Sequence, residues 1–169
     1  LGPMGNLILA PAFGTTGAQA DIGPLPEWTV YYLISQDERA KEMMLENADA
    51  AGSVPIHYLD EETDQPLDVE KYPTVSVSFG TSKPLLPPVT DRTIWSPDSA
   101  HQASFTYIPY LMTGDAFYLD ETIFWAAWNI ASVNPEYRNS SAGLIRSNQV
   151  RAQAWALRSI GEAVRALPD

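Results

Sequence analysis

The hexapeptide YLISQD at residues 32–37 is matched 78 positions later by YLMTGD at residues 110–115. An Asp closes each copy. Asp37 and Asp115 stand where a helix N-cap belongs, since their side-chain oxygens can accept hydrogen bonds from the free amides of the next helical turn. Gly114 fits the position just past a helix end. The two segments therefore predict two helical hairpins built on one pattern.

Working outward from these turns, we expect five helices that form two full hairpins and half of a third. Hairpin one covers about residues 24–51, hairpin two about residues 98–133, and the half hairpin about residues 147–169. Pro109 should kink the third helix or delay its start, and Ser147 is expected to cap the fifth. The five expected helices span residues 25–35, 38–51, 99–112, 116–133 and 148–167.

The repeat also bears on domain organisation. Repeated hairpins bury their apolar faces only against neighbouring units. The sequence LPD at residues 167–169 places Asp169 where Asp37 and Asp115 stand, so the chain is expected to stop partway through a third repeat. A length of 169 residues suits one domain. We therefore expect residues 1–169 to form a single, partial domain.

The connection at residues 52–97 is too long for a plain loop in a compact domain. Residues 54–59 and 74–79 are strand candidates, and the second of them alternates apolar and polar side chains with period two. Residues 60–65 read as a polar turn, and residues 83–88 as a Pro-rich extended strap. The fold class expected is mainly α, with antiparallel helical hairpins and a small β insertion around residues 54–79.

Composition excludes several classes of function. The chain has 21 acidic and 10 basic side chains and no cysteine, so disulfides, cysteine-ligated zinc and a cysteine nucleophile are excluded. Residues 21–70 carry 13 acidic and two basic side chains, a charge that repels nucleic acid. No apolar run reaches the ~18 residues that span a membrane. The glycine-rich stretch at residues 14–23 lacks the spacing of a phosphate loop, and no cofactor is expected.

The short turns close one end of each hairpin, so we expect the long connections at residues 52–97 and 134–147 to gather at the other end. Loops carry function more often than the scaffold beneath them, which makes this face the candidate site. Catalytic candidates there are Asp21, Asp98, His57 and His101. Substrate-binding candidates are Trp95, Gln102, Arg151 and Trp155. Asp60, Arg138 and Gln149 are expected nearby.

Each candidate group has a structural alternative. Asp21 and Asp98 precede the first helix of their hairpins, so they form either an acid–base pair or two N-caps. His57 and His101 are either bases or hydrogen-bonded loop residues, and no HExxH or comparable metal spacing is present. Arg151 could clamp a carboxylate and Trp155 could stack on a sugar ring, or both could belong to a packed helix surface.

Several segments resemble the (α/α)6-toroid, six-hairpin glycosidase-like proteins. The resemblance rests on GAQADIGPLPEW at residues 17–28, IHYLDE at 56–61, PDSAHQ at 97–102, YLMTGD at 110–115 and RAQAWALR at 151–158. It implies an α/α toroid whose site lies in the funnel at the long-loop end. A full toroid has twelve helices, so this chain would supply part of one, and none of that class's established catalytic residues maps onto a position here.

The resemblance implies a carbohydrate-active domain that processes an oligo- or polysaccharide as a hydrolase or lyase. Hydrolysis would use the Asp21–Asp98 carboxylate pair, whereas a lyase would use a His or Tyr base beside an Arg. A non-catalytic helical module for binding or scaffolding remains the alternative. Since unpaired repeat surfaces are apolar, two copies could also associate and complete each other's helical faces.

Overall fold

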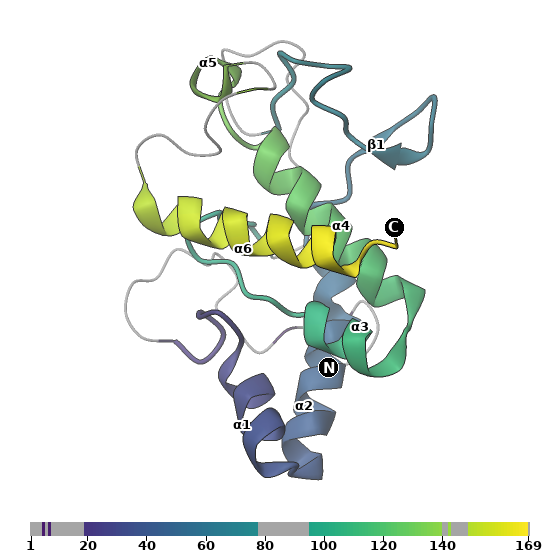
Figure 1. Ribbon diagram of the computed structural model, residues 1–169, viewed down its shortest axis with the longest axis vertical. Coiled ribbons are helices and arrows are strands. Elements are labelled where there is room, and N and C mark those ends of the chain that lie inside the picture. Colours follow the sequence, from purple (N-terminus) through teal and green to yellow (C-terminus); the bar gives the residue numbers. More distant parts are fainter. Residues whose placement is uncertain are drawn as a thin grey trace.

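The protein is mainly helical, with one small antiparallel sheet (Figure 1). The computed structural model describes residues 5, 7, 19–77, 95–139, 142 and 149–168. Their helices are α1 (Glu27–Ser35), α2 (Glu38–Ala50), the 3₁₀ turn η1 (Ala51–Ser53), α3 (Tyr107–Thr113), α4 (Ala116–Ala131), α5 (Pro135–Arg138) and α6 (Val150–Ala166). The strands are β1 (Leu59–Asp60) and β2 (Gln65–Pro66).

The two hairpin turns have the caps that the repeat predicts. Asp37 and Asp115 each accept a hydrogen bond of 2.9 Å from the amide two residues ahead. Gly114 ends α3 with a φ of 69°, and Gln36 takes the equivalent position after α1 with a φ of 57°. The left-handed conformation suits Gly, so the second hairpin makes this turn with less strain than the first.

The third helix is shorter than predicted. It begins at Tyr107, and residues 95–106 form an irregular segment that is almost entirely buried. Pro109 lies in the first turn of α3, where its missing amide costs no helical hydrogen bond. Before it, polar side chains divert the backbone into turns: Asp98 accepts a bond of 2.7 Å from the amide of Ala100. Local side-chain bonds of this kind compete with helix formation.

Two further boundaries differ from expectation. The last helix starts at Val150 with Gln149 as its cap, whereas Ser147 lies outside the described residues. The short helix α5, capped by Asn134, was not predicted, although Asn-Pro is a recognisable helix start because Pro fits the first helical position.

The small β insertion is confirmed, but its strands are shorter than expected. β1 pairs with β2 across the predicted polar turn. Val54 and Ile56, in the first strand candidate, are buried but unpaired in a sheet. In the second candidate, the amide of Val77 bonds the carbonyl of Ala131 at 3.1 Å, and residues 78–79 lie outside the described residues.

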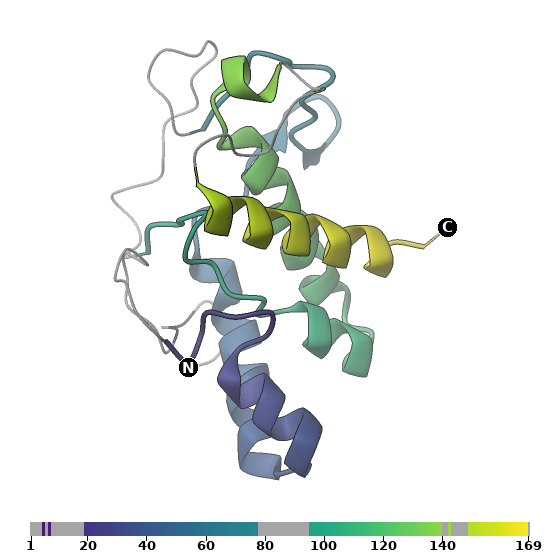
Figure 2. The same cartoon turned by 60° about the vertical axis from the view of Figure 1, so that its left-hand side comes forward.

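The body of the molecule is built around α4 and α6, which cross and pack closely (Figures 1 and 2). Mostly small side chains on the inner face of α6 allow this close approach: they are Ala152, Ala156, Ser159, Ala163 and Ala166. The buried core contains Trp28, Met44, Trp125 and Trp128. The α1–α2 hairpin extends from this body at one end (Figures 1 and 2).

The two hairpins do not lie side by side with matching ends. Asp49, in the last turn of α2, accepts a hydrogen bond of 2.6 Å from the hydroxyl of Tyr118, in the first turn of α4. The end of α2 therefore meets the beginning of α4. The prediction that all long connections gather at one end and all short turns at the other is wrong, because the repeat fixes each hairpin but not how one hairpin packs on the next.

Candidate active site at His101

The centre of the candidate site is an imidazole held by a carboxylate. His101 Nδ1 lies 3.1 Å from Asp98 Oδ2, so the Nδ1 proton is donated to Asp98 and Nε2 is left as an acceptor in the neutral ring. His101 is only 8% exposed. Its Nε2 is buried and has no hydrogen-bond partner among the residues that the structure describes. A buried polar atom without a partner is costly, and at a functional site it marks a position that a ligand can complete.

A second carboxylate, that of Asp21, is electrostatically coupled to the same imidazole. Asp21 is 6% exposed, and burial raises the pKa of its carboxyl group, while the positive charge that His101 can carry acts in the opposite direction. The turn that holds Asp21 is closed by a hydrogen bond of 2.6 Å from the amide of Glu27 to the carbonyl of Ala20. The structure thus pairs Asp98 with His101 and buries Asp21 within electrostatic range of that ring.

Neither carboxylate caps a helix. The cap position of α1 is occupied by Pro26, and Asp98 lies nine residues before α3. The two carboxylate oxygens of Asp98 instead accept hydrogen bonds from the amide of Ala100 and from the ring of His101. The structural alternative of two N-caps is therefore wrong for both residues.

Gln102 fixes the backbone beside His101. The side chain is fully buried and exchanges two hydrogen bonds of 2.8 Å with the amide of Asn129 on α4. It also donates to the carbonyl of Ser99 and accepts from Ser159 on α6. Both amide atoms are therefore engaged within the protein, and we assign Gln102 to positioning the loop rather than to contacting a substrate.

Arg158 joins the two segments that carry the site. Its guanidinium donates to the carbonyl of Gly23 at 2.6 Å and to the carbonyl of Gln102 at 3.2 Å. Burial lowers the pKa of Arg158, opposed by the charge of Glu162. Burial also raises the pKa of Glu162, opposed by Arg158 and by a bond of 2.8 Å from Ser104. Arg158 thus acts as a tie between the Asp21 turn and the His101 segment.

The remaining substrate-binding candidates lie outside this cluster or serve packing. Trp155 is half-buried, with the Arg158 guanidinium 5.1 Å from its ring centroid. Trp95 is 5% exposed within the hydrophobic core. Arg151 is exposed at the start of α6. Arg138, expected at the site, is instead buried and donates to four backbone carbonyls, those of Pro73, Val75, Ile130 and Val133.

His57 belongs to a different place in the fold. Its Nε2 lies 2.8 Å from Oε1 of Glu121, a carboxylate buried on α4, and its ring packs edge-on against Phe124. Within the described part of the chain, the other carboxylate oxygen of Glu121 is buried and has no hydrogen-bond partner. Asp60 also lies elsewhere, bonded to Lys71 at 2.7 Å, and this ion pair lowers the pKa of Asp60. The structure therefore separates His57 and Asp60 from the His101 site.

Sequence reasoning missed Glu121 and Asn129. Both lie on the inner face of α4 in a run rich in aromatic and aliphatic residues. A Glu and an Asn in such a run are unusual enough to signal buried polar partners, but no spacing shows that the partners are His57 and Gln102. Within the described ranges, no group of three or more His, Cys, Asp or Glu side chains is arranged to hold a metal ion.

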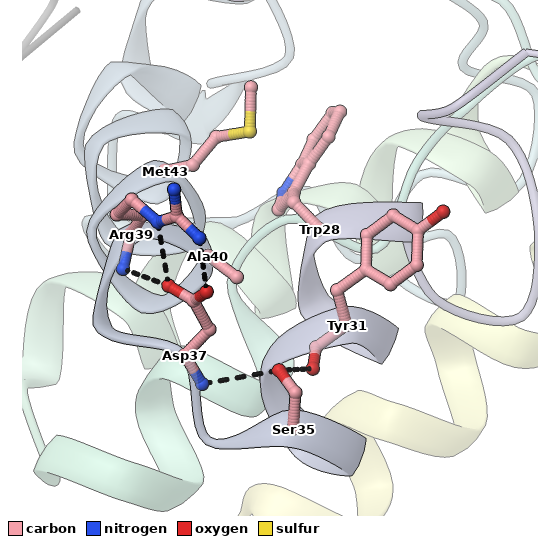
Figure 3. Close-up of a pocket in the computed structure, with 7 residues that line it drawn as sticks. All are labelled: Trp28, Tyr31, Ser35, Asp37, Arg39, Ala40 and Met43. Atoms are coloured by element: carbon pink, nitrogen blue, oxygen red, sulfur yellow. Dashed lines mark hydrogen bonds and ion pairs between the residues drawn. The ribbon is translucent and has the colours of Figure 1, made fainter.

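A separate hollow of about 410 Å³ lies between α1 and α2 near their turn (Figure 3). Trp28 and Tyr31 face Met43 across it. At the turn, the carboxylate of Asp37 is bonded twice to the guanidinium of Arg39, which lowers the Asp37 pKa to about 2. Because these two charged groups already neutralise each other, the hollow has no evident chemistry of its own.

None of the helices in the described part of the chain combines the length and the apolar character needed to cross a bilayer. The sequence matches no protein-family model, no curated protein and no solved structure. The function is therefore argued from the geometry around His101 and from the resemblance drawn from the sequence.

Proposed function

We propose that this chain is a carbohydrate-active domain that hydrolyses a glycosidic bond of a neutral oligo- or polysaccharide at the His101 site. The observation that carries the proposal is the His101 ring. Asp98 holds its Nδ1, Nε2 is an acceptor without a partner among the described residues, and the buried Asp21 is electrostatically coupled to it. The resemblance to six-hairpin glycosidase-like proteins supplies the substrate class.

The three side chains divide the proton transfers between them. Asp21, whose pKa is raised by burial, is suited to be the general acid that protonates the leaving glycosidic oxygen. Nε2 of His101 accepts a proton from the attacking water, while Asp98 holds the ring in the required tautomer. Return of the proton from the imidazolium to the Asp21 carboxylate then restores the starting state.

The burial of the site sets a condition on this chemistry. Since Nε2 of His101 is buried, a glycan reaches it only when the residues that cover the ring move aside. Hydrogen bonds of catalytic groups often become productive only in the substrate complex. Exclusion of water from Nε2 of His101 in the substrate-free protein is consistent with a site that becomes productive only in the substrate complex.

The experiment is a reducing-end assay on a panel of neutral polysaccharides, with wild type, Asp21→Asn and Asp98→Asn. Losing the acid should lower kcat by roughly 10²–10⁴-fold, and losing the group that orients His101 should also lower it. Glu61→Gln, which changes an exposed carboxylate away from the site, should leave the rate unchanged. Thermal unfolding of each variant shows that the fold is kept.

Two outcomes would overturn the proposal. If the wild type releases no reducing ends from any polysaccharide in the panel, the proposed hydrolytic activity is wrong. If both Asp21→Asn and Asp98→Asn keep the wild-type activity, the assignment of the active site to these residues is wrong. Clustered titratable groups at one buried position favour chemistry over a purely scaffolding role, which is why we rank the non-catalytic alternative second.

The relation to the (α/α)6 toroid is part of the proposal. It is supported by the repeated turn with its two Asp caps. The contact between Asp49 and Tyr118 sets a constraint on it: any ring that contains this chain has to accommodate hairpins that meet end to end at this point.

A further inference from the structure

Helix α6 is apolar on two opposite faces. Its small inner face packs on α4, and its outer face carries an exposed line of residues spaced by four, three, four and three positions, the spacing of a helix–helix seam. We call this line the α6 stripe: Val150, Ala154, Leu157, Gly161 and Val164. The exposed fractions of Val150, Leu157 and Val164 are 88%, 53% and 67%. A helix that is apolar on both faces is normally covered on both.

The charges beside the α6 stripe are positive. Arg151 and Arg165 are exposed next to it, one near each end of the helix. The other two charged residues of α6, Arg158 and Glu162, are turned inward and lie 3.9 Å apart. The outer surface of α6 therefore presents two arginines and no carboxylate, which favours an acidic partner.

The first hairpin has the complementary properties. α1 carries an exposed apolar surface on the side away from the hollow of Figure 3, which we call the α1 face: Val30, Leu33 and Ile34, with exposed fractions of 37%, 44% and 79%. Residues 27–50 hold six acidic and two basic side chains. Glu27 and Glu42 are exposed, whereas Glu38 is paired with Lys41 and the exposed Arg39 with Asp37. The hairpin extends from the body (Figures 1 and 2), so a second molecule has room to approach it.

We propose that the α6 stripe of one molecule packs on the α1 face of a second copy. Charge complementarity decides between this contact and a symmetric pairing of two α6 stripes, because two α6 helices would set Arg151 and Arg165 against arginines of the other copy. Complementary potentials favour one partner, and like charges disfavour the other. A contact between two different surfaces is heterologous, so it leaves one of each surface free and builds a ring or an open chain.

The test is analytical ultracentrifugation of the whole chain with charges placed on either surface. Ile34→Glu adds a charge to the α1 face and Leu157→Glu adds one to the α6 stripe. Both side chains are exposed, so the fold should be kept, as circular dichroism can verify. Wild type should self-associate with increasing concentration, less so at high salt. Each variant should raise the dissociation constant by about tenfold or more. Leu59→Glu, at an exposed apolar residue on β1, is the matched control and should behave as wild type.

Mixing the two variants gives the decisive result. Each keeps one intact surface, so an equimolar mixture of Ile34→Glu and Leu157→Glu should form a heterodimer and nothing larger. If Ile34→Glu associates like wild type while Leu157→Glu does not, the contact is between two α6 helices and the proposal is wrong. A wild type that stays monomeric up to roughly 1 mM, where association would be worth only about 4 kcal/mol, also overturns it.

Discussion

Among the ionisable groups of the site, the carboxyl group of Asp21 is the one whose ionisation the fold opposes most clearly. Burial raises its pKa from the ordinary value of 3.8, so the native state holds this proton at pH values where the unfolded chain has lost it. Stability contributed by this group therefore falls as the pH rises from about 3.8 through the folded-state pKa, and then levels off.

Asp21→Asn removes this titration. We expect the free energy of unfolding of the wild type to fall relative to that of Asp21→Asn as the pH rises from 4 upward, because only the wild type buries a group that must ionise. Urea unfolding at a series of pH values measures the difference. Glu61→Gln serves as the control, since its curve should run parallel to wild type. Parallel curves for Asp21→Asn would show that the carboxyl group is not desolvated.

At the scale of single residues, the sequence was informative where chemistry follows from residue type. Two Asp residues and His101 were recognisable as candidates, and the structure bonds one of them, Asp98, to His101. The role of Gln102 could not be predicted, because its partners Asn129 and Ser159 lie 27 and 57 positions away. His57 was expected at the same site because it lies in the long connection at residues 52–97, but it is bonded to Glu121 on α4.

At the scale of elements, two glycines offer a matched pair of opposite effects. A Cβ added to Gly161 in α6 meets nothing within 4 Å, and neither does one added to Gly114, but Gly114 has a φ of 69°. Gly161→Ala should stabilise the protein by about 0.5–1 kcal/mol, since Gly is a poor helix former. Gly114→Ala should destabilise it by about 1 kcal/mol through strain in the left-handed conformation.

Chemical unfolding of the two variants beside wild type measures both changes. Equal effects of the same sign would contradict the assignment of Gly114 as a strained turn and Gly161 as an ordinary helical position.

Element boundaries followed from the sequence where the signal was local. The caps at Asp37 and Asp115 depend on amides two residues away, and both were predicted. Residues 99–106 were predicted to be helical, but a local bond from Ala100 to Asp98 and buried bonds from Gln102 and Thr106 to α4 hold them irregular. Such bonds depend on tertiary contacts, which cannot be predicted from the periodicity of apolar residues in the sequence.

At the scale of the whole molecule, Arg158 joins the Asp21 turn, the His101 segment and α6. Arg158→Met removes the bonds to Gly23 and Gln102 and leaves Glu162 buried without its cation. Removing one member of a buried pair costs about 3–5 kcal/mol, and we expect a loss of that size in urea unfolding. The double variant Arg158→Met with Glu162→Met should be less destabilised than the single one. If the double variant is less stable than Arg158→Met, the burial of an unpaired Glu162 is not the main cause of the lost stability.

The packing of the elements in the whole molecule is also the feature that was predicted least well from the sequence. A repeat of 78 positions indicates that two hairpins are alike, but the packing of one on the other depends on single contacts such as Asp49 with Tyr118. The crossing of α4 and α6 depends on five small side chains of α6, none of which is distinctive in the sequence. Mainly helical class and turn chemistry were therefore predictable, whereas the packing of hairpins was not.

The most direct test of the central claim compares His101→Gln with His57→Gln on whichever polysaccharide the wild type cleaves. Both histidines are bonded to a carboxylate, so the two variants differ mainly in which site loses its imidazole. We expect kcat to fall by roughly 10²-fold or more for His101→Gln and to stay within about twofold of wild type for His57→Gln. Equal rates for the two variants, or a larger loss for His57→Gln, would contradict the assignment of His101 as the base.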